Sequence, residues 1–346
     1  MSKLEPLKFG IIGCSRIAKR SVIPAILKSQ FAELEIIGSR STDKAKEFAK
    51  EFSCEKFGSY EDVISDDSVD AVYISTPIST HEEWSNKATE AGKHVYVEKS
   101  STYSFDSAKK MVESAKENNV RLMEGFMFRF HTQHQKVKEL INDGKIGEVK
   151  SFNSVFGFPA FPEGDIRYDK ITFGGGFLSD SGCYPICASR MIFNEEPSSV
   201  FCKQEIVKGN GGKLTDVSGS AILFYENDKI ATITYSNGSY YQAKYEVWGT
   251  DGVISLDRAY SVPPDFTTRV TLQYNTENNW DGRRTETFEI EPKDHFVEIL
   301  DTFCMEITGT KKAPFDFELE LLNQAKVMSA AILSSGHKVM WLSEMS

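Results

Sequence analysis

The sequence has few cysteines, no long apolar run and no excess of positive charge. Its six cysteines form no C-x-x-C pair and no zinc-like spacing, so neither a disulfide framework nor a metal site is expected. No apolar stretch approaches the roughly 18 residues of a membrane helix, and the amino-terminal run is too short for a signal peptide. The formal net charge of −10 disfavours nucleic acid and anionic membranes as partners. These absences predict a soluble, cytoplasmic protein.

What is present is an ordinary globular composition in two parts, since 346 residues suggest two domains. In the first third, short apolar runs alternate with amphipathic stretches, which predicts a doubly wound, Rossmann-like parallel α/β domain over residues 1–124. The expected strands cover residues 7–13, 34–39, 69–75, 94–97 and 120–124, and the expected helices cover residues 17–29, 42–52, 81–91 and 105–118.

From about residue 146 the pattern changes to β-rich runs separated by glycine and Asn-Asp turns. This change predicts an α+β domain over residues 125–346 with one large open, mostly antiparallel sheet. Helices on one face would leave the other face for a partner subunit, so a homodimer or homotetramer is expected. The expected strands cover residues 148–156, 200–207, 219–224, 230–235, 245–249 and 253–256, and the helices cover 133–142, 177–193, 294–308 and 317–333.

The loop after the first strand nearly matches the dinucleotide fingerprint G-x-G-x-x-G/A. Gly13 is the first glycine, Ala18 is the last small residue, and Ser15 replaces the middle glycine. The added Cβ requires either a shifted loop or a serine hydroxyl that bonds a phosphate oxygen. The loop, including Cys14, Arg16 and Ile17, is therefore predicted to hold a pyrophosphate at a helix amino terminus. The alternative is a doubly wound domain that binds no nucleotide.

The second strand ends at Ser39 and Arg40, where an NAD site normally has a carboxylate for the ribose 2′-hydroxyl. A guanidinium can instead pair with a 2′-phosphate and stack on adenine. NADP(H) is therefore favoured over NAD(H). The alternative reading of Arg40 is a solvated arginine at a strand end.

Two further segments combine polar groups with backbone freedom. Lys99 directly follows a buried strand, and ligands bind beyond the carboxyl ends of parallel strands. Far downstream, three glycines at 174–176 precede Asp180 and Tyr184, which are four residues apart and can share one face of a helix.

Together these motifs resemble the glucose-fructose oxidoreductase/inositol dehydrogenase (Gfo/Idh/MocA) superfamily over essentially the full length. The matching parts are the Gly13 loop, residues 76–81, Glu98-Lys99, residues 124–131, and residues 174–184. The pattern is most similar to the branches of nucleotide-sugar 3-ketoreductases and dimeric dihydrodiol dehydrogenases, and NADP-dependent xylose dehydrogenases share much of it. Besides Ser15, the chain departs from the family at Ser100, where a proline usually follows Glu-Lys.

The resemblance implies a role for each matching residue. Tyr184 would donate the proton to a ketone that receives a hydride, while Lys99 would bond the substrate oxygen and favour the phenolate. Asp180 would orient the substrate or neighbouring donors, and the alternative is a carboxylate on the face of a helix without a role in the site. The residues expected at the cofactor are Thr76, Pro77, His81 and Glu98, and those expected at the substrate are Arg129 and Arg167. Apart from the resemblance, Arg129, Arg167 and Lys244 are candidates for binding a substrate diphosphate.

Several of these residues have structural alternatives. Arg167 could form a salt bridge instead, and His81 could be a hydrogen-bonded structural histidine. His131 and His134 have helical spacing, but no third metal ligand is evident. No metal is expected, because a nicotinamide carries the redox step.

The sequence thus predicts an NADP(H)-dependent oxidoreductase that interconverts a ketone and a secondary hydroxyl on a sugar, with a nucleotide-linked 3-keto sugar preferred. One alternative is an NADP-dependent aldose or trans-dihydrodiol dehydrogenase. Another is a non-catalytic sensor that binds NADP(H). Retention of both Lys99 and Tyr184 argues against the sensor, which needs no proton donor.

Overall fold

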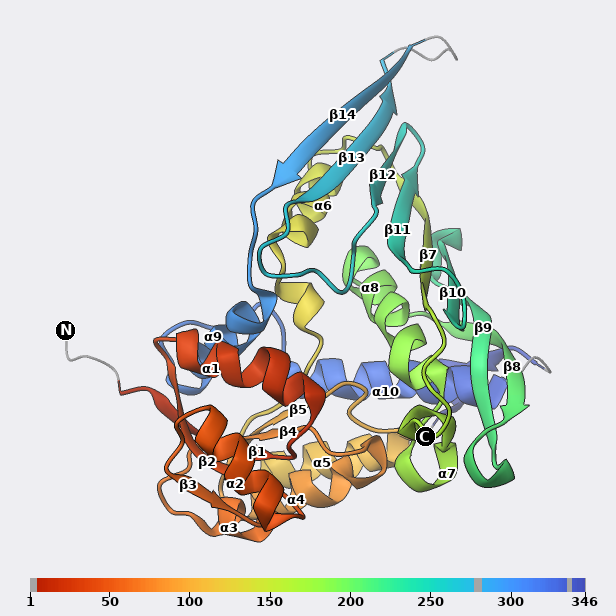
Figure 1. The fold of residues 1–346 in the computed structure, drawn as a ribbon. Coiled ribbons are helices and arrows are strands. Elements are labelled where there is room, and N and C mark those ends of the chain that lie inside the picture. The colour runs from red at the N-terminus through yellow and green to blue at the C-terminus, as the bar shows by residue number, and fades with distance from the viewer. Residues whose placement is uncertain (1–4, 277–281, 335–337, 346) are drawn as a thin grey trace. The chain divides into compact units, whose positions relative to one another are not determined.

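The computed structural model describes residues 5–276, 282–334 and 338–345. These residues form two compact units (Figure 1). The first contains the chain up to Met127 together with Phe296–Ala325, and the second contains Phe128–His295 and the residues from Lys326 onward.

The first unit is built on a six-stranded parallel sheet in the order β3-β2-β1-β4-β5-β6. Because the order runs outward from β1 in both directions, β1 and β4 flank the point where the winding reverses. The doubly wound fold is therefore confirmed. Its strands are β1 (Leu7–Ile12), β2 (Ala32–Gly38), β3 (Lys56–Gly58), β4 (Ala71–Ile74), β5 (His94–Val97) and β6 (Leu122–Glu124), and its first helices are α1 (Ile23–Lys28), α2 (Thr42–Glu51), α3 (Tyr60–Ser65), α4 (His81–Glu90) and α5 (Phe105–Glu117).

Successive side chains of the central strands point to opposite faces of this sheet, so apolar residues cover both faces. Val72 and Val95 belong to a buried cluster that includes residues of α3, α4 and α5. Tyr96, between Val95 and Val97, contacts the ring of Phe303 instead. Both faces are thus covered, as an all-parallel sheet requires.

Two helices from the end of the chain contribute to the first unit. Phe303 of α9 (His295–Ile307) lies 6.5 Å from the ring of Phe9 in β1. Arg121 pairs with Glu318 in α10 (Phe317–Ser334) at 2.9 Å. Residues 296–325 therefore pack with the first unit, whereas the predicted division at 124/125 placed them in a continuous second domain.

The second unit contains a nine-stranded sheet in the order β14-β13-β12-β11-β7-β10-β9-β8-β15. Only β7 and β10 pair in parallel; every other neighbouring pair of the sheet as described is antiparallel, which confirms the predicted α+β class. The strands are β7 (Val149–Phe158), β8 (Ser199–Lys208), β9 (Leu214–Phe224), β10 (Ile230–Asn237), β11 (Gln242–Gly249), β12 (Gly252–Leu256), β13 (Thr268–Asn275), β14 (Arg283–Ile290) and β15 (Met340–Trp341).

Helices pack on one face of this sheet. α6 (Thr132–Asn142) contacts β13, and α8 (Cys183–Phe193) contacts β7 and β10. On the other face the strands present polar side chains such as Lys203, Glu205 and Ser220, which are exposed. The sheet therefore supports α8, the helix that carries Tyr184.

The structure also differs from the predicted elements in detail. β3, α3, β13, β14 and β15 were not predicted. Two predicted helices begin with π-helical turns, at Ala18–Val22 and at Leu178–Gly182. A single-turn π-helix is often found at functional sites.

Candidate functional site

The polar loops of the first unit lie at one edge of its sheet. Ile12 is in register with Gly38 and Ile74, and Ile74 is in register with Val97. The residues that follow these four therefore begin at the same carboxyl edge. They are Gly13, Ser39, Ser75 and Glu98.

The Gly13 loop accommodates Ser15 without losing its turn. Gly13 has φ +114°, and a Cβ there would lie 3.1 Å from the backbone carbon of Ser75. The Ser15 hydroxyl accepts from the amide of Ala18 at 3.0 Å and donates to Ser75 Oγ at 2.9 Å. Ser75 in turn donates to the carbonyl of Gly13 at 2.9 Å. The serine thus caps the first turn rather than crowding the loop, and the remaining turn and helix start suit a pyrophosphate.

The neighbouring loop residues have different exposures. Cys14 is buried, its Sγ lies 3.8 Å from the carbonyl of Gly38, and burial raises the pKa of its thiol. Arg16 is exposed and Ile17 is half-buried. Arg16 is thus the loop side chain best placed to meet an anion from solvent.

The end of β2 presents hydroxyl and cationic groups. Ser39 is buried, and its hydroxyl accepts from the amide of Ser41 at 3.2 Å. Arg40 is exposed beside Tyr60, where its charge opposes the effect of burial, which raises the pKa of that phenol. Lys44 follows in the first turns of α2. This set fits a 2′-phosphate, because cations and hydroxyls stand where an NAD site has a carboxylate.

His81 ties together two loops at the same edge. It is buried, its Nε2 lies 2.8 Å from the carbonyl of Thr76, and its Nδ1 lies 3.1 Å from the carbonyls of Ser100 and Ser101. Burial lowers its pKa, although these carbonyls oppose that shift. The geometry matches the structural alternative for His81, which holds Thr76 and Pro77 near the segment after Lys99.

Glu98 and Lys99 follow β5 directly. The Glu98 carboxylate accepts from Tyr73 Oη at 2.7 Å and from the Lys99 amide at 3.2 Å. The peptide between Lys99 and Ser100 is cis, and the Ser101 amide donates to Glu124 at 2.6 Å. Sequence reasoning did not identify Tyr73 or Ser75 as supports; their positions at the end of β4 were the available signal.

In the second unit the structure brings Arg167 and Asp180 together. Arg167 Nε lies 3.0 Å from Asp180 Oδ2, and its Nη1 lies 3.0 Å from Asp165 Oδ1. The guanidinium also stacks 4.2 Å from the ring centroid of Phe161. The salt bridge weighed for Arg167 is therefore present, and it links two predicted substrate residues. Asp165 was not predicted.

The three glycines shape the turn that carries Asp180. Gly174 ends a short helix, α7 (Lys170–Phe173), in a left-handed conformation. A Cβ on Gly175 would lie 2.5 Å from the carbonyl of Arg167, and the Gly176 amide donates to that carbonyl at 2.8 Å. The glycine run thus closes onto the Arg167 backbone, which side chains would prevent.

Tyr184 is the second residue of α8 and is 7% exposed. Its ring lies 5.2 Å from Phe156, 5.7 Å from Tyr260 and 5.8 Å from Phe128. These aromatic contacts fix the plane of its ring while the helix fixes its backbone. A phenol held in this way suits directed proton transfer.

Of the two other cations predicted at the substrate, only one shares this region. Arg129 Nη1 lies 4.0 Å from the Sγ of Cys187, one turn after Tyr184 on α8. Lys244 alternates with the buried Ala243 and Tyr245, so its side chain points to the other face of the sheet. Lys244 therefore does not lie on the same face as Tyr245, and its candidacy for a substrate diphosphate stays a prediction.

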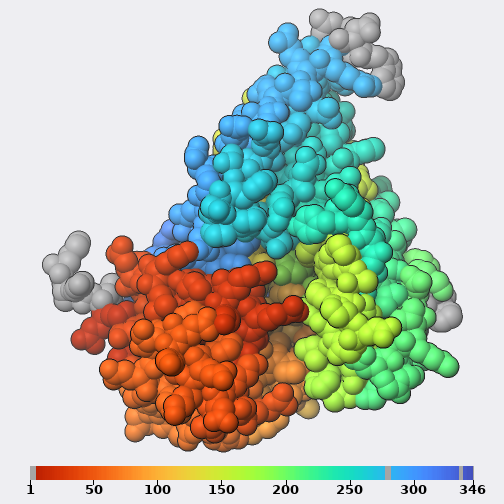
Figure 2. Space-filling model, in the orientation of Figure 1, coloured from red at the N-terminus to blue at the C-terminus, as the bar shows by residue number. Residues whose placement is uncertain are grey.

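Two segments of the second unit lie side by side near Arg167. In Figure 2 the yellow-green surface near residue 165 lies beside the green surface of β8 and β9. The Asn210 side chain donates to the carbonyl of Asp165 at 2.8 Å, and Lys213 pairs with Asp169 at 3.2 Å. The β8–β9 hairpin therefore holds the backbone that carries Arg167.

The histidines of the second unit are buried in protein contacts. His134 Nδ1 lies 2.8 Å from Tyr245 Oη and its Nε2 lies 2.9 Å from the carbonyl of Ala259. Burial lowers the pKa of His134 to about 3 and that of His131 to about 4. Within the part of the chain that the structure describes, no group of three or more potential ligands is arranged to hold a metal ion.

These buried histidines predict loss of stability in acid. The unfolded chain binds protons below about pH 6.5 but the folded chain does so only near pH 3 to 4, so the free energy of unfolding falls as pH drops through that window. Each histidine contributes about 1.4 kcal/mol per pH unit. Urea unfolding at pH 7, 6 and 5 should show this slope, and His134→Gln should reduce it. An equal slope in the variant would contradict the assignment.

Comparison with known proteins agrees with this architecture. Residues 7–126 match the model described as an oxidoreductase family with an NAD-binding Rossmann fold, and residues 134–255 match the GFO/IDH/MocA C-terminal domain. Among the described residues, no helix has both the length and the apolar character needed to span a membrane.

The chain is similar to several enzymes over most of their length. It is 31% identical to dTDP-3,4-didehydro-2,6-dideoxy-alpha-D-glucose 3-reductase from Actinomadura kijaniata, covering 94% of this chain and 95% of that one. It is 35% identical to D-xylose 1-dehydrogenase (NADP(+)) 2 from Haloferax volcanii, covering 86% and 88%. The crystal structure of a 3-ketoreductase from Actinomadura kijaniata with NADP and TDP-benzene superimposes with a TM-score of 0.88, at 31% identity and 95% and 98% coverage.

Proposed function

Because the chain belongs to the GFO/IDH/MocA family of oxidoreductases, we propose that it is an NADPH-dependent reductase of a keto group on a nucleotide-linked sugar. The observation that carries this proposal is the full-length similarity to a 3-ketoreductase, found together with the register-matched edge of the first sheet. That edge offers the turn and cationic groups that an NADP molecule needs.

The first unit supplies the cofactor site in this proposal. The Gly13–Ile17 loop holds the pyrophosphate, Ser39 and Arg40 hold the 2′-phosphate, and His81 and Glu98 keep the neighbouring loops in place. When bound, the nicotinamide supplies the hydride.

Lys99 and Tyr184 act on the substrate oxygen. As a ketone carbon gains a hydride, its oxygen gains negative charge, which the Lys99 ammonium stabilises. Tyr184 donates its phenolic proton to that oxygen, giving the secondary alcohol, and regains a proton from solvent. Arg167, held between Asp165 and Asp180, and Arg129 offer guanidinium groups to the polar part of the substrate.

Arg40→Asp is expected to raise the KM for NADPH by roughly 100-fold, because a charge-assisted contact is lost and a carboxylate faces the 2′-phosphate. The KM for NADH should fall. Initial rates with each cofactor at saturating substrate measure this change. Lys46→Asp, on the exposed side of α2, makes the same charge change and should leave both KM values near wild type. Equal KM values for NADPH in the two variants would remove Arg40 from the phosphate site.

The proposed reaction is tested by following absorbance near 340 nm across free and nucleotide-linked sugars and keto sugars. NADPH consumption with dTDP-3,4-didehydro-2,6-dideoxy-alpha-D-glucose, after which the Actinomadura kijaniata relative is named, supports the reductase. NADP⁺ reduction with D-xylose or a trans-dihydrodiol alone moves the assignment to the dehydrogenase alternative. Cofactor binding with no turnover on the panel favours the sensor.

We also infer a cytoplasmic homodimer or homotetramer. All six cysteines lie in described segments and none forms a disulfide, which suits a reducing compartment. Among the described residues, the face of the nine-stranded sheet opposite α6 and α8 presents exposed polar side chains such as Lys203 and Glu205, and a second copy can cover this area. Sedimentation equilibrium tests this inference, and a single species of 38.9 kDa would contradict it.

A further inference from the structure

Asp216 in β9 is a buried charge outside the residues assigned above. It is 1% exposed, and a buried carboxylate is costly unless it is well bonded. Its Oδ2 accepts from the Leu178 amide at 2.6 Å and from Tyr235 Oη at 3.3 Å. Its Oδ1 lies 3.5 Å from Lys170 Nζ. Three donors from three separate segments therefore meet at this carboxylate.

The bond to Leu178 connects Asp216 with the turn that leads into α8. Leu178 is the first residue of the π-helical turn Leu178–Gly182, and its carbonyl accepts from the amide of Cys183. Cys183 directly precedes Tyr184. Leu178 thus bonds the carboxylate through its amide and the residue before the proposed proton donor through its carbonyl. A carboxylate at this end of a helix also interacts favourably with the helix dipole.

The glycines of this region leave the space that Asp216 and its partner Tyr235 occupy. A Cβ on Gly176 would lie 2.4 Å from Asp216 Oδ1, and a Cβ on Gly182 would lie 2.9 Å from the Tyr235 ring. Gly219 is equally restricted, because its Cβ would lie 2.6 Å from Tyr235 Oη. The backbone therefore closes on this pair from both the turn and the neighbouring strand.

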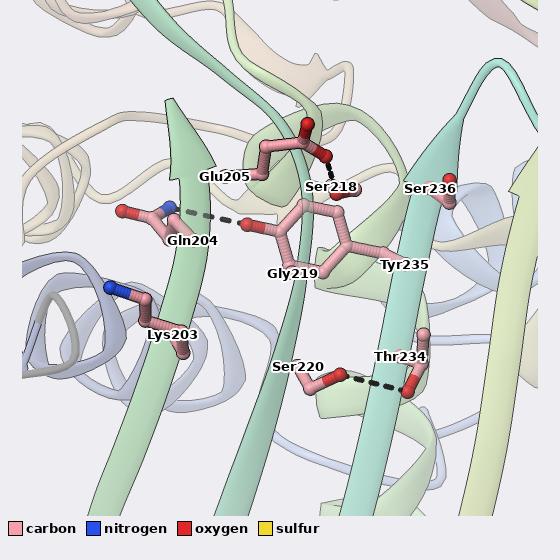
Figure 3. Close-up of a pocket in the computed structure, with 9 residues that line it drawn as sticks. All are labelled: Lys203, Gln204, Glu205, Ser218, Gly219, Ser220, Thr234, Tyr235 and Ser236. Atoms are coloured by element: carbon pink, nitrogen blue, oxygen red, sulfur yellow. Dashed lines mark hydrogen bonds between the residues drawn. The ribbon is translucent and has the colours of Figure 1, made fainter. Parts of the chain in front are cut away.

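Tyr235 is itself held on its other side. Gln204 Nε2 donates to Tyr235 Oη at 3.2 Å, and Figure 3 shows this bond beside Gly219. The phenol thus accepts from Gln204 and donates to Asp216, and burial raises its pKa. The network joins β8, β9 and β10 of the sheet to the turn.

We propose that Asp216 is a positioning residue for Tyr184, anchoring the Leu178–Gly182 turn to the rigid sheet so that the phenol and Asp180 take up their places. The inference rests on the proposed function, in which Tyr184 donates the proton. The anchor is needed because the turn follows three glycines, whose backbone has little intrinsic preference for one conformation. A small displacement of a reacting group costs a large factor in rate.

Asp216→Asn tests the anchor, since the amide keeps the size of the side chain but turns an NH₂ toward a donor. We expect kcat to fall roughly 10- to 100-fold while the KM for NADPH stays within about twofold. Glu196→Gln is the matched control. It weakens the pairing of Glu196 with the buried Arg190, whose Nε lies 2.6 Å from Glu196 Oε2, at the other end of α8. It should lower stability with kcat unchanged.

A second readout does not depend on activity. Hydrogen exchange measured on peptides covering residues 176–186 should be faster in Asp216→Asn than in wild type, and unchanged in Glu196→Gln. Tyr235→Phe removes one hydrogen-bond donor to Asp216 and keeps the carboxylate. It should therefore lower kcat and speed up exchange by smaller factors than Asp216→Asn does. This variant replaces Asp216→Asn as the test if Asp216→Asn does not fold.

The outcomes separate the two claims. If wild type turns over no sugar, the proposed function fails, and the exchange experiment still decides whether Asp216 anchors the turn. If wild type is active and Asp216→Asn has wild-type kcat, or if exchange over residues 176–186 matches wild type, the positioning role is overturned. Slower turnover together with faster exchange confined to these residues supports it.

Discussion

Tyr184→Phe is expected to lower kcat by about 10²- to 10⁴-fold with little change in the KM for NADPH, because it removes the proposed proton donor and keeps the ring. The ring contacts with Phe156, Tyr260 and Phe128 need no hydroxyl, so the fold should persist. Stopped-flow and steady-state rates of NADPH oxidation measure the loss.

The control for this variant is Tyr225→Phe. Tyr225 is also buried, and its hydroxyl bonds Ser189 Oγ on α8 at 2.8 Å. Tyr184 belongs to α8 and Tyr225 packs against it, yet only Tyr184 is assigned to chemistry. Tyr225→Phe should therefore lose stability and keep kcat. If Tyr184→Phe loses no more activity than Tyr225→Phe, another group donates the proton.

Lys99→Met is expected to lower kcat by about 10²- to 10³-fold, because the substrate oxygen loses the ammonium that stabilises its developing charge. Methionine keeps most of the length and apolar body of the side chain. The loss should appear in kcat with a smaller change in the KM for the sugar, since the interaction strengthens as charge develops.

Lys93→Met provides a control at the opposite end of the same strand. Lys93 precedes β5 and Lys99 follows it. Lys93 is buried and its Nζ donates to the carbonyls of Val69 and Asp66 at 2.7 and 3.0 Å, so its loss should affect stability alone. Ligands bind at the carboxyl ends of parallel strands, which is why only Lys99 should matter for rate. Similar kcat values for the two variants would exclude that role for Lys99.

Much of the first unit was predictable because its strands are buried on both faces and its helices are amphipathic. β4 and β5 read as continuous apolar runs, and α2 and α5 begin at serine caps. β3 was missed because it has three residues, two of them exposed. β13 was missed although Val270 and Leu272 alternate with polar residues, a pattern that does predict a strand.

The packing of α9 with the first unit could not be predicted from its position near the end of the chain. Its buried ring, Phe303, meets Phe9, which lies almost 300 positions earlier. The sequence of an amphipathic helix shows that one of its faces is apolar, but it does not show which surface that face packs against.

The site was predictable where a residue type is itself unusual for its position. Gly13, Lys99 and the glycines at 174–176 stood out in this way. The anchor at Asp216 did not, because its bond to Leu178 joins residues 38 positions apart. Asp216 is the one charged residue of β9, whose other residues are apolar, glycine or hydroxyl-bearing, and this was the signal. Its meaning depends on the donors that the fold brings to it.

Hydride transfer from NADPH to the sugar is tested most directly by following the hydride itself. The protein is incubated with the dTDP-linked keto sugar and with NADPH that carries deuterium at the transferable position of C4. The mass of the sugar product is then measured by mass spectrometry. We expect one deuterium on the carbinol carbon of the sugar, with formation slowed in Tyr184→Phe. Reduced sugar without deuterium from either face of the labelled cofactor, or binding of both ligands without any reduced sugar, would contradict it.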